Sequence, residues 1–382
     1  MNSAQFLEFL VSLSIQATVL VGITDWLCRV SRWPQAQYKL WSYCHLLLLL
    51  LTGCGLLLPH LRVLTNPWQI MSPEALQQLV SVEQSLGQLA LVIWATGILL
   101  SLIMLASEWI TVARFLKSCR PATESEVKLV FNDQSSHLTS TFLQPNASIQ
   151  LLISQRFNSP FCYQWHAPVL VMPEYLLSLP QDEITFIARH ELSHLRSGHP
   201  LQLFIERLVM TLFWFHPAIW WASRQSMLAR EYACDDAAIS ARYEVVGYLK
   251  TLLAVAERGF HKEPEGSALY FGSGSSMMAL RGRRILARFE STADWSPPDQ
   301  RARWWPFHLM TAMAMITWSF WLPVDALASS RMAWSPWPGW SAAVLRTIDI
   351  SARDYEPYDR STRLHELSLE SSQPQASSRS PY

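Results

Sequence analysis

Long apolar runs near the start of the chain constrain its fold more than any other feature. Three of them, at residues 6–28, 38–59 and 89–107, are long enough to cross a bilayer, because a membrane-spanning helix needs about 20 mostly apolar residues. The chain is therefore expected to place three transmembrane helices within residues 1–110. A fourth apolar run predicts a last transmembrane helix at 306–328.

The composition fits a protein that lies partly in a membrane and partly in water. Hydrophobic residues make up 50% of the 382 residues and charged ones only 16%, against about 25% in an ordinary soluble domain. Lys plus Arg and Asp plus Glu both number 30, so there is no basic excess to neutralise nucleic-acid phosphates. The six cysteines form no C-x-x-C pair, which argues against a zinc ribbon. We expect a few spans, one compact aqueous domain at 111–305 and no direct contact with nucleic acid.

The positions of Lys and Arg around the spans predict their orientation, because cytoplasmic flanks carry an excess of positive charge. Between the second and third spans there is only Arg62. The other flanking basic residues gather on the opposite side: Arg29, Arg32, Lys39, Arg114, Lys117 and Arg120. We therefore predict a bacterial-type inner-membrane protein with its N-terminus outside, residues 111–305 in the cytoplasm, and an outer tail, 329–382, that is largely disordered. The basic run Arg281–Arg288 is expected to contact anionic lipid rather than nucleic acid.

The segment His190-Glu191-Leu192-Ser193-His194 is an H-E-x-x-H motif. On a helix, histidines four residues apart present both rings on one face, where they can share a metal ion, and the glutamate between them can act as a base. Pro180 and an acidic first turn predict a helix start, and Ser197-Gly198 with Pro200 predicts its end. A second copy, His365-Glu366-Leu367-Ser368, has Leu369 at the position of the second histidine and is interpreted as accidental.

A catalytic zinc site needs three protein ligands, so a third must come from elsewhere in the chain. The candidate is Glu231, with Asp235 one turn later on the same predicted helix face. Asp235 is expected to accept a hydrogen bond from the outer ring nitrogen of His190. The alternative for Glu231 is an ordinary solvated helix charge. His199 is a further candidate ligand, although its five-residue offset from His194 favours a position outside the ligand set.

Residues 201–222 are apolar enough to span a membrane, which conflicts with a shared zinc site. A crossing would put His194 and Glu231 about 30 Å apart. Because Pro217 disfavours helix at His216, we predict a helical hairpin over 200–240. This hairpin is expected either to lie buried against the other spans or to dip into the cytoplasmic leaflet.

Two further segments, 149–153 and 161–172, are expected to be strands. An edge strand beside the motif helix could bind an extended substrate by strand addition. An ordinary small sheet that covers the helix is an equally good interpretation.

Taken together, these motifs resemble the BlaR/MecR-type antirepressor membrane zinc metallopeptidases. The resemblance rests on four segments in order: Pro168–Pro173, His190–Arg196, Phe215–Trp221 and Arg230–Asp236. It implies an α-helical membrane protein with an embedded α+β gluzincin-like zinc peptidase domain. It also implies one Zn²⁺ per chain on His190, His194 and Glu231, with Glu191 as base. Residues 329–382 contain no Lys, so the Ser-x-x-Lys motif of the family's penicillin-binding sensor is absent from them.

The expected function is a membrane-bound zinc endopeptidase that cleaves a cytoplasmic or membrane-proximal protein. The resemblance implies regulated signalling, with a transcriptional repressor as substrate. The alternatives are a broad-specificity quality-control metallopeptidase and a non-catalytic signalling scaffold with a structural zinc. The expected partners are the protein substrate and the bilayer, and a homodimer is left open. Candidates for stabilising the oxyanion are Tyr232, His216 and Arg230.

Overall fold

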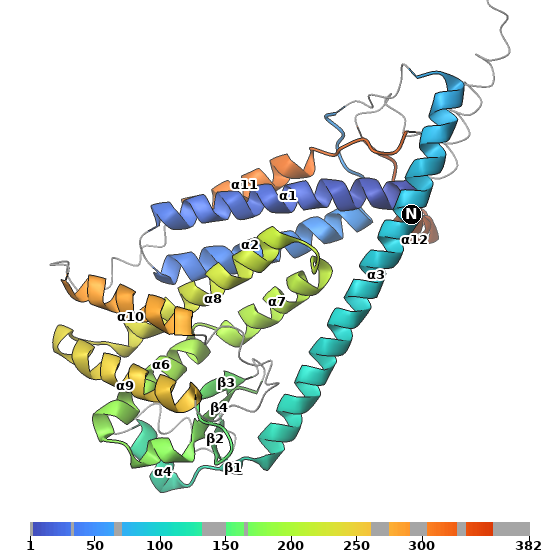
Figure 1. Ribbon diagram of the computed structural model, residues 1–382. Helices are drawn as coiled ribbons and strands as arrows, with labels where there is room; N and C mark the ends of the chain where they lie inside the picture. Colours follow the sequence, from blue (N-terminus) through green and yellow to red (C-terminus); the bar gives the residue numbers. More distant parts are fainter. Residues whose placement is uncertain are drawn as a thin grey trace, which may run out of the picture.

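The structure is a computed structural model, and it describes residues 3–31, 34–64, 71–131, 150–163, 167–260, 275–290, 304–326 and 334–353. Helices dominate, and the strands form one small mixed sheet. Long apolar helices gather at one end of the molecule, while the sheet and its covering helices lie at the other end (Figure 1).

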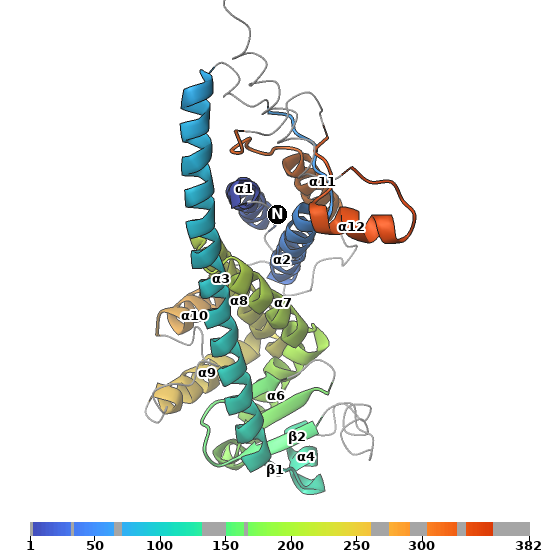
Figure 2. The same cartoon turned by 90° about the vertical axis from the view of Figure 1, so that its right-hand side faces the viewer.

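The bundle begins with α1 (Ser3–Val30), α2 (Pro34–Leu57) and α3 (Pro73–Ser118), each long and apolar enough to cross a membrane. These are the three N-terminal helices expected from the sequence. α3 has 46 residues, which at 1.5 Å per residue is about 69 Å. That is roughly twice the thickness of bilayer hydrocarbon, and α3 accordingly runs from the bundle down to the sheet (Figure 2).

The last apolar run forms a shorter helix than expected. Instead of a helix over 306–328, α11 (Trp305–Trp318) has 14 residues, about 21 Å, and the following residues up to 326 are not helical. Pro323 disfavours helix at the preceding residue. The backbone N–H of that residue, Leu322, donates instead to Ser12 Oγ of α1 at 3.0 Å. Residues 327 and 328 lie outside the described part of the chain.

A helical hairpin packs into the bundle over the range predicted for one. Its arms are α7 (His199–Leu212) and α8 (Pro217–Ala238), and their buried apolar residues share one core with α1, α2 and α11. Two residues of the bundle hold the turn between the arms. Trp94 Nε1 of α3 donates to Leu212 O at 3.0 Å, and His216 Nε2 donates to Ser14 O of α1 at 3.1 Å.

The sheet has the strand order β1-β2-β4-β3. Its central strands β2 (Gln150–Ser154) and β4 (Val169–Pro173) run parallel, with Leu152 opposite Val171. The strand expected at 161–172 is in fact two: β3 (Phe161–Tyr163) pairs antiparallel with β4 and forms one edge, and β1 (Arg120–Pro121) pairs antiparallel with β2 at the other. Residues 149 and 164–166 lie outside the described residues.

Two helices cover the sheet and build the second core. Buried side chains of α4 (Glu124–Phe131) and α6 (Gln181–Arg196) pack on those of β2 and β4, joined by Leu176 of the 3₁₀ turn η3 (Glu174–Ser178). α6 carries the H-E-x-x-H motif, so the core of the sheet fixes one face of the motif helix. A third cluster joins α6 to the end of α8, to α9 (Val245–Phe260) and to α10 (Ser275–Glu290).

The basic run on α10 contacts protein, which corrects the expected lipid contact. Arg281 forms ion pairs with Glu231 and Asp235 of α8, and Arg284 and Arg288 both pair with Asp236 of the same helix. These three arginines face three carboxylates on α8. Of the four arginines of the run, only Arg283 is exposed.

The tail also differs from its expected disorder where the structure describes it. Residues 334–353 contain α12 (Gly339–Thr347), and Trp334 forms a β-bridge with Leu61, which follows α2. Trp340 Nε1 donates to Leu56 O at 3.0 Å. Residues 354–382, including the second H-E-x-x sequence, lie outside the described part.

Candidate metal centre

The candidate centre lies where α6 crosses α8. His190 and His194 are one helical turn apart on α6, and their Nε2 atoms are 3.3 Å apart. Glu231 on α8 faces them, with Oε2 3.5 Å from His190 Nε2 and Oε1 3.6 Å from His194 Nε2. The structure thus brings together three of the residues that the sequence analysis singled out.

The spacing of these atoms fits a bound metal ion. Two imidazoles on a tetrahedral zinc, with bonds of 2.0–2.1 Å, have their ligating nitrogens about 3.3 Å apart. The donor set of two nitrogens and one carboxylate is typical of catalytic zinc sites, which leave a fourth position for water or substrate. These residues are one of two metal-ligand groups among the described residues; the other is His194, His199 and Cys234.

The outer face of His190 is held by a chain of buried polar groups. His190 Nδ1 lies 3.0 Å from Tyr248 Oη and 3.4 Å from Asp235 Oδ1. Tyr248 Oη donates to Asp235 Oδ1 at 2.6 Å. Asp235 thus lies near the outer nitrogen of His190, but the hydrogen bond of that nitrogen is with Tyr248 Oη. Tyr248 lies on α9 and joins Asp235 beside this ring nitrogen.

Arg281 supplies the positive charge that balances these carboxylates. Its Nη1 is 2.9 Å from Glu231 Oε2, and its Nε donates to Asp235 Oδ2 at 2.9 Å. Burial would raise the pKa of Glu231, but Arg281 and the two motif histidines outweigh it and hold that pKa well below its usual range. Glu231 is thus an anion that is ready to bind a cation.

Glu191, the motif glutamate, lies buried beside the edge strand β3. Cys162 Sγ on that strand donates to Glu191 Oε2 at 3.4 Å and contacts Glu191 O at 3.2 Å. Burial raises the pKa of the Glu191 carboxyl. A carboxylate with a raised pKa accepts a proton more readily, which suits a general base.

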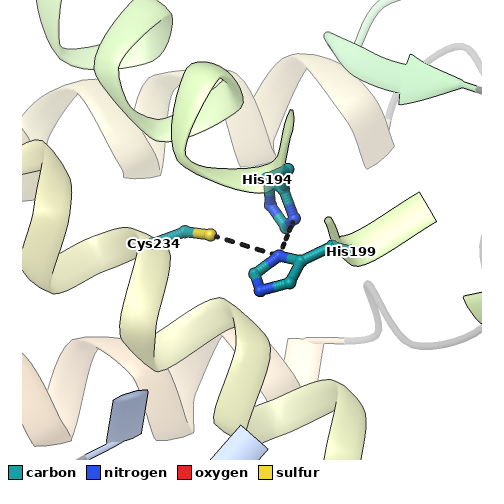
Figure 3. A group of neighbouring side chains, drawn as sticks. All are labelled: His194, His199 and Cys234. Atoms are coloured by element: carbon teal, nitrogen blue, oxygen red, sulfur yellow. Dashed lines mark hydrogen bonds between the residues drawn. The ribbon is translucent and has the colours of Figure 1, made fainter. Parts of the chain in front are cut away.

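On the opposite side of His194 lies the second group, shown in Figure 3. His199 Nδ1 is 2.8 Å from His194 Nδ1, and Cys234 Sγ is 3.7 Å from the same His199 atom. His199 is the first residue of α7. It follows Gly198, whose positive φ of 67° turns the chain sharply out of α6, a conformation that a side chain at this position would strain.

The three side chains considered as oxyanion partners have other contacts. Arg230 is buried and donates to Glu206 Oε2 of α7 at 2.7 Å, which ties the two arms of the hairpin together. His216 lies in the hairpin turn against α1. Tyr232 packs under Arg284, whose guanidinium carbon is 4.9 Å from the ring centroid.

Sequence reasoning missed Tyr248, Arg281 and Cys162. None of them belongs to a motif, and each comes from a different element. A weak signal existed for Arg281, because the basic run on α10 and the acidic run on α8 have complementary charges. The sequence alone does not show that the two runs meet.

A donor group typical of metallopeptidases thus occurs in a chain with three helices long and apolar enough to cross a membrane. Comparison with known proteins gives the family. The family profile described as BlaR1 peptidase M56 matches residues 8–272, more than half of the chain, so this chain belongs to the M56 peptidase family. The regulatory protein BlaR1 of Bacillus licheniformis is 21% identical over 164 residues. That match covers 42% of this chain and 26% of the relative, so only about a quarter of the relative's length is represented.

Proposed function

We propose that this chain is a membrane-embedded zinc endopeptidase in which His190, His194 and Glu231 hold the metal. The observation that carries the proposal is the convergence of these three side chains from α6 and α8 at metal-ligand spacing. Glu191 lies between the two histidines on the same helix and does not belong to the donor set. This is the arrangement in which a base stands next to the metal without occupying a ligand position.

The chemistry divides between the metal and the protein. Bound zinc would supply Lewis-acid polarisation of the attacking water and of the scissile carbonyl. Glu191 takes a proton from the water while the water oxygen adds to the carbonyl carbon. Glu191 then transfers that proton to the leaving amine nitrogen. Tyr248 and Asp235 orient His190 through its outer nitrogen, and Arg281 holds Glu231 through an ion pair with its Oε2.

The substrate is proposed to be an extended polypeptide that lies along β3. This strand has one neighbour, β4, so in the described residues its other edge carries no paired strand. Its Cys162 touches Glu191, which places the strand next to the proposed base. A substrate strand added here would present its peptide bonds to the metal, with main-chain hydrogen bonds supplying affinity.

The biological role proposed is regulated cleavage of a cytoplasmic or membrane-proximal protein, with a repressor as the first candidate. Support comes from membership of the M56 family and from the relative's description as a regulatory protein. In this proposal α7 and α8 form a re-entrant hairpin and the peptidase body is cytoplasmic. Because the catalytic body faces the cytoplasm, its substrate must be reachable from there.

The test is the substitution Glu191→Gln, with Glu183→Gln in the first turn of the same helix as control. Gln cannot accept the proton of the water, so we expect a loss of at least about 10²-fold in cleavage, with zinc content unchanged at one per chain. Proteomes of cells that express each variant would show which proteins accumulate only in Glu191→Gln. Cleavage at the wild-type rate by Glu191→Gln would show that Glu191 is not the base. Proteomes that do not differ between wild type and Glu191→Gln would instead favour a non-catalytic scaffold with a structural zinc.

A further inference from the structure

We propose that His199 is a positioning residue for the ligand His194: its Nδ1 accepts a hydrogen bond from His194 Nδ1–H and so leaves His194 Nε2 unprotonated for the metal. The proposal rests on the zinc site described above. It assigns a role to a residue that is neither a member of the donor triad nor part of the H-E-x-x-H motif.

The geometry of the pair is that of a hydrogen bond. The two Nδ1 atoms are 2.8 Å apart, and the ring centroids are 4.9 Å apart with the planes at 74° (Figure 3). The His199 side chain is buried, at 1% exposure, and its ring stands edge-on to Tyr38 of α2, with centroids 4.9 Å apart. A buried ring held on two sides can keep a fixed orientation toward His194.

Counting protons decides which ring donates. Two neutral imidazoles that face each other through Nδ1 share one proton between these atoms. If the proton were on His199, His194 would carry its own proton on Nε2, and that nitrogen could not bind a metal. Metal binding at His194 Nε2 therefore requires the proton on His194 Nδ1, with His199 as acceptor and its own proton on Nε2.

The same distances argue against a second metal ion on His194, His199 and Cys234. Nitrogens bound to one tetrahedral zinc lie about 3.3 Å apart, which matches the 3.3 Å between His190 Nε2 and His194 Nε2. The 2.8 Å between His194 and His199 is shorter than that and lies in the range of an N–H···N hydrogen bond. The geometry therefore points to a metal at one nitrogen of His194 and a hydrogen bond at the other.

The two ligand histidines thus have partners of different charge. His190 faces Tyr248 and the carboxylate of Asp235, which is balanced by Arg281. His194 faces a neutral ring instead. A neutral acceptor fixes the tautomer without adding a second negative charge to a buried site that already holds Glu191, Glu231 and Asp235.

The test compares His199→Leu with His199→Asn in the full-length protein in detergent. The Oδ1 atom of Asn occupies the position of the His Nδ1 and can accept the bond, whereas Leu has a methyl group there. Zinc affinity is measured by competition with a chelator. We expect His199→Leu to weaken zinc binding about 10- to 100-fold and His199→Asn to remain within a few-fold of wild type.

Thermal unfolding of the metal-free proteins controls for folding. If His199→Leu does not fold, His199→Gln replaces it, because the Gln oxygen lies at the position of His Nε2 and not of Nδ1.

Three outcomes would overturn the proposal. The first is wild-type zinc affinity in His199→Leu, or in His199→Gln where that variant replaces it. The second is equal weakening in His199→Asn and in the variant that cannot accept the bond, whether His199→Leu or His199→Gln. The third is two zinc ions per chain that fall to one in Cys234→Ser, together with a thiolate-to-metal band in the Co²⁺-loaded wild type, because that result would make the group a metal site. Failure of the zinc site itself is recognised separately, since the wild type would then bind no zinc or His190→Ala would bind it normally.

Discussion

Glu231 and Asp236 lie five residues apart on α8, and both pair with arginines of α10, yet only Glu231 faces the histidines. Glu231→Ala removes one of three proposed ligands, so we expect it to lose most of its zinc. Asp236→Ala is the matched control and should keep about one zinc per chain. Metal analysis of the two purified variants makes the comparison. Full zinc occupancy in Glu231→Ala would remove this residue from the ligand set.

Arg281 is buried between two carboxylates of α8, and its loss would leave them uncompensated. Removing one partner of a buried ion pair typically costs about 3–5 kcal/mol. We therefore expect Arg281→Met to lower the free energy of unfolding by about that amount. Arg283→Met, an exposed arginine on the same helix, should change it little.

Zinc should reduce the effect of Arg281→Met, because the bound cation replaces the lost positive charge next to Glu231. Denaturant unfolding with and without zinc measures both variants. Equal stability of the two metal-free variants would show that Arg281 does not balance these carboxylates.

At the level of single residues, the sequence was most informative where spacing alone determines proximity. His190, Glu191 and His194 lie within about one helical turn. The four-residue step from Glu231 to Asp235 likewise puts both carboxylates on one face of α8. Tyr248 and Cys162 come from elements that only the tertiary fold brings to the site. No local pattern distinguishes this tyrosine or cysteine from others in the chain.

Among the elements, the hairpin depends on a close approach to α3. A Cβ added at Gly97 would overlap the ring of Trp214 in the hairpin turn. Trp214 cannot move without cost, because its Nε1 donates to Trp94 O and its carbonyl accepts from Trp220 Nε1. Gly97→Ala is therefore expected to displace the turn and to lower the melting temperature.

The control for this substitution is Gly53→Ala on α2, where an added Cβ meets nothing within 4 Å. Ala is favoured over Gly in a helix by about 1 kcal/mol, so this variant should be as stable as wild type or slightly more stable. Thermal unfolding of the two variants in detergent gives the comparison. A melting temperature that rises equally in both would mean that the hairpin turn does not pack against Gly97.

Hydropathy predicted some elements well and others poorly, for physical reasons. A long apolar run identifies a buried or lipid-facing segment, and this was enough for α1, α2 and α3. It does not show whether the segment is helical throughout. After Trp318 the chain remains apolar but non-helical, because its backbone finds acceptors such as Ser12 on α1. Such partners are visible only in the packed bundle.

At the scale of the whole molecule, the candidate centre lies at the junction of bundle and sheet. α6 belongs to the core of the sheet, whereas the buried residues of α8 belong largely to the core of the bundle. The three donors meet only when the core of the bundle and the core of the sheet keep this relative position. Any movement between the bundle and the sheet would therefore change the distance from Glu231 to the histidines.

The same architecture makes a topological prediction. His194 precedes the hairpin and Glu231 lies near the end of its second arm, α8, so they can share one metal only if both ends of the hairpin emerge on one side of the membrane. Single cysteines at the exposed positions Asp182, before the site, and Ser240, after α8, should therefore react from the same side. A cysteine at exposed Gln78, near the start of α3, should react from the other side, because Arg114, Lys117 and Arg120 around the end of α3 predict a cytoplasmic position for that end.

Labelling with a membrane-impermeant maleimide in intact and permeabilised cells makes the measurement, with the parent protein and its native cysteines as background. We expect Gln78→Cys to react in intact cells, and Asp182→Cys and Ser240→Cys to react only after permeabilisation. Reaction of all three from outside would invert the orientation but keep the hairpin, since the two flanks would still agree. Reaction of Asp182→Cys and Ser240→Cys from opposite sides would have a different meaning. It would put α6 and the end of α8 about 30 Å apart across the bilayer, and no single zinc ion could then bind both His194 and Glu231.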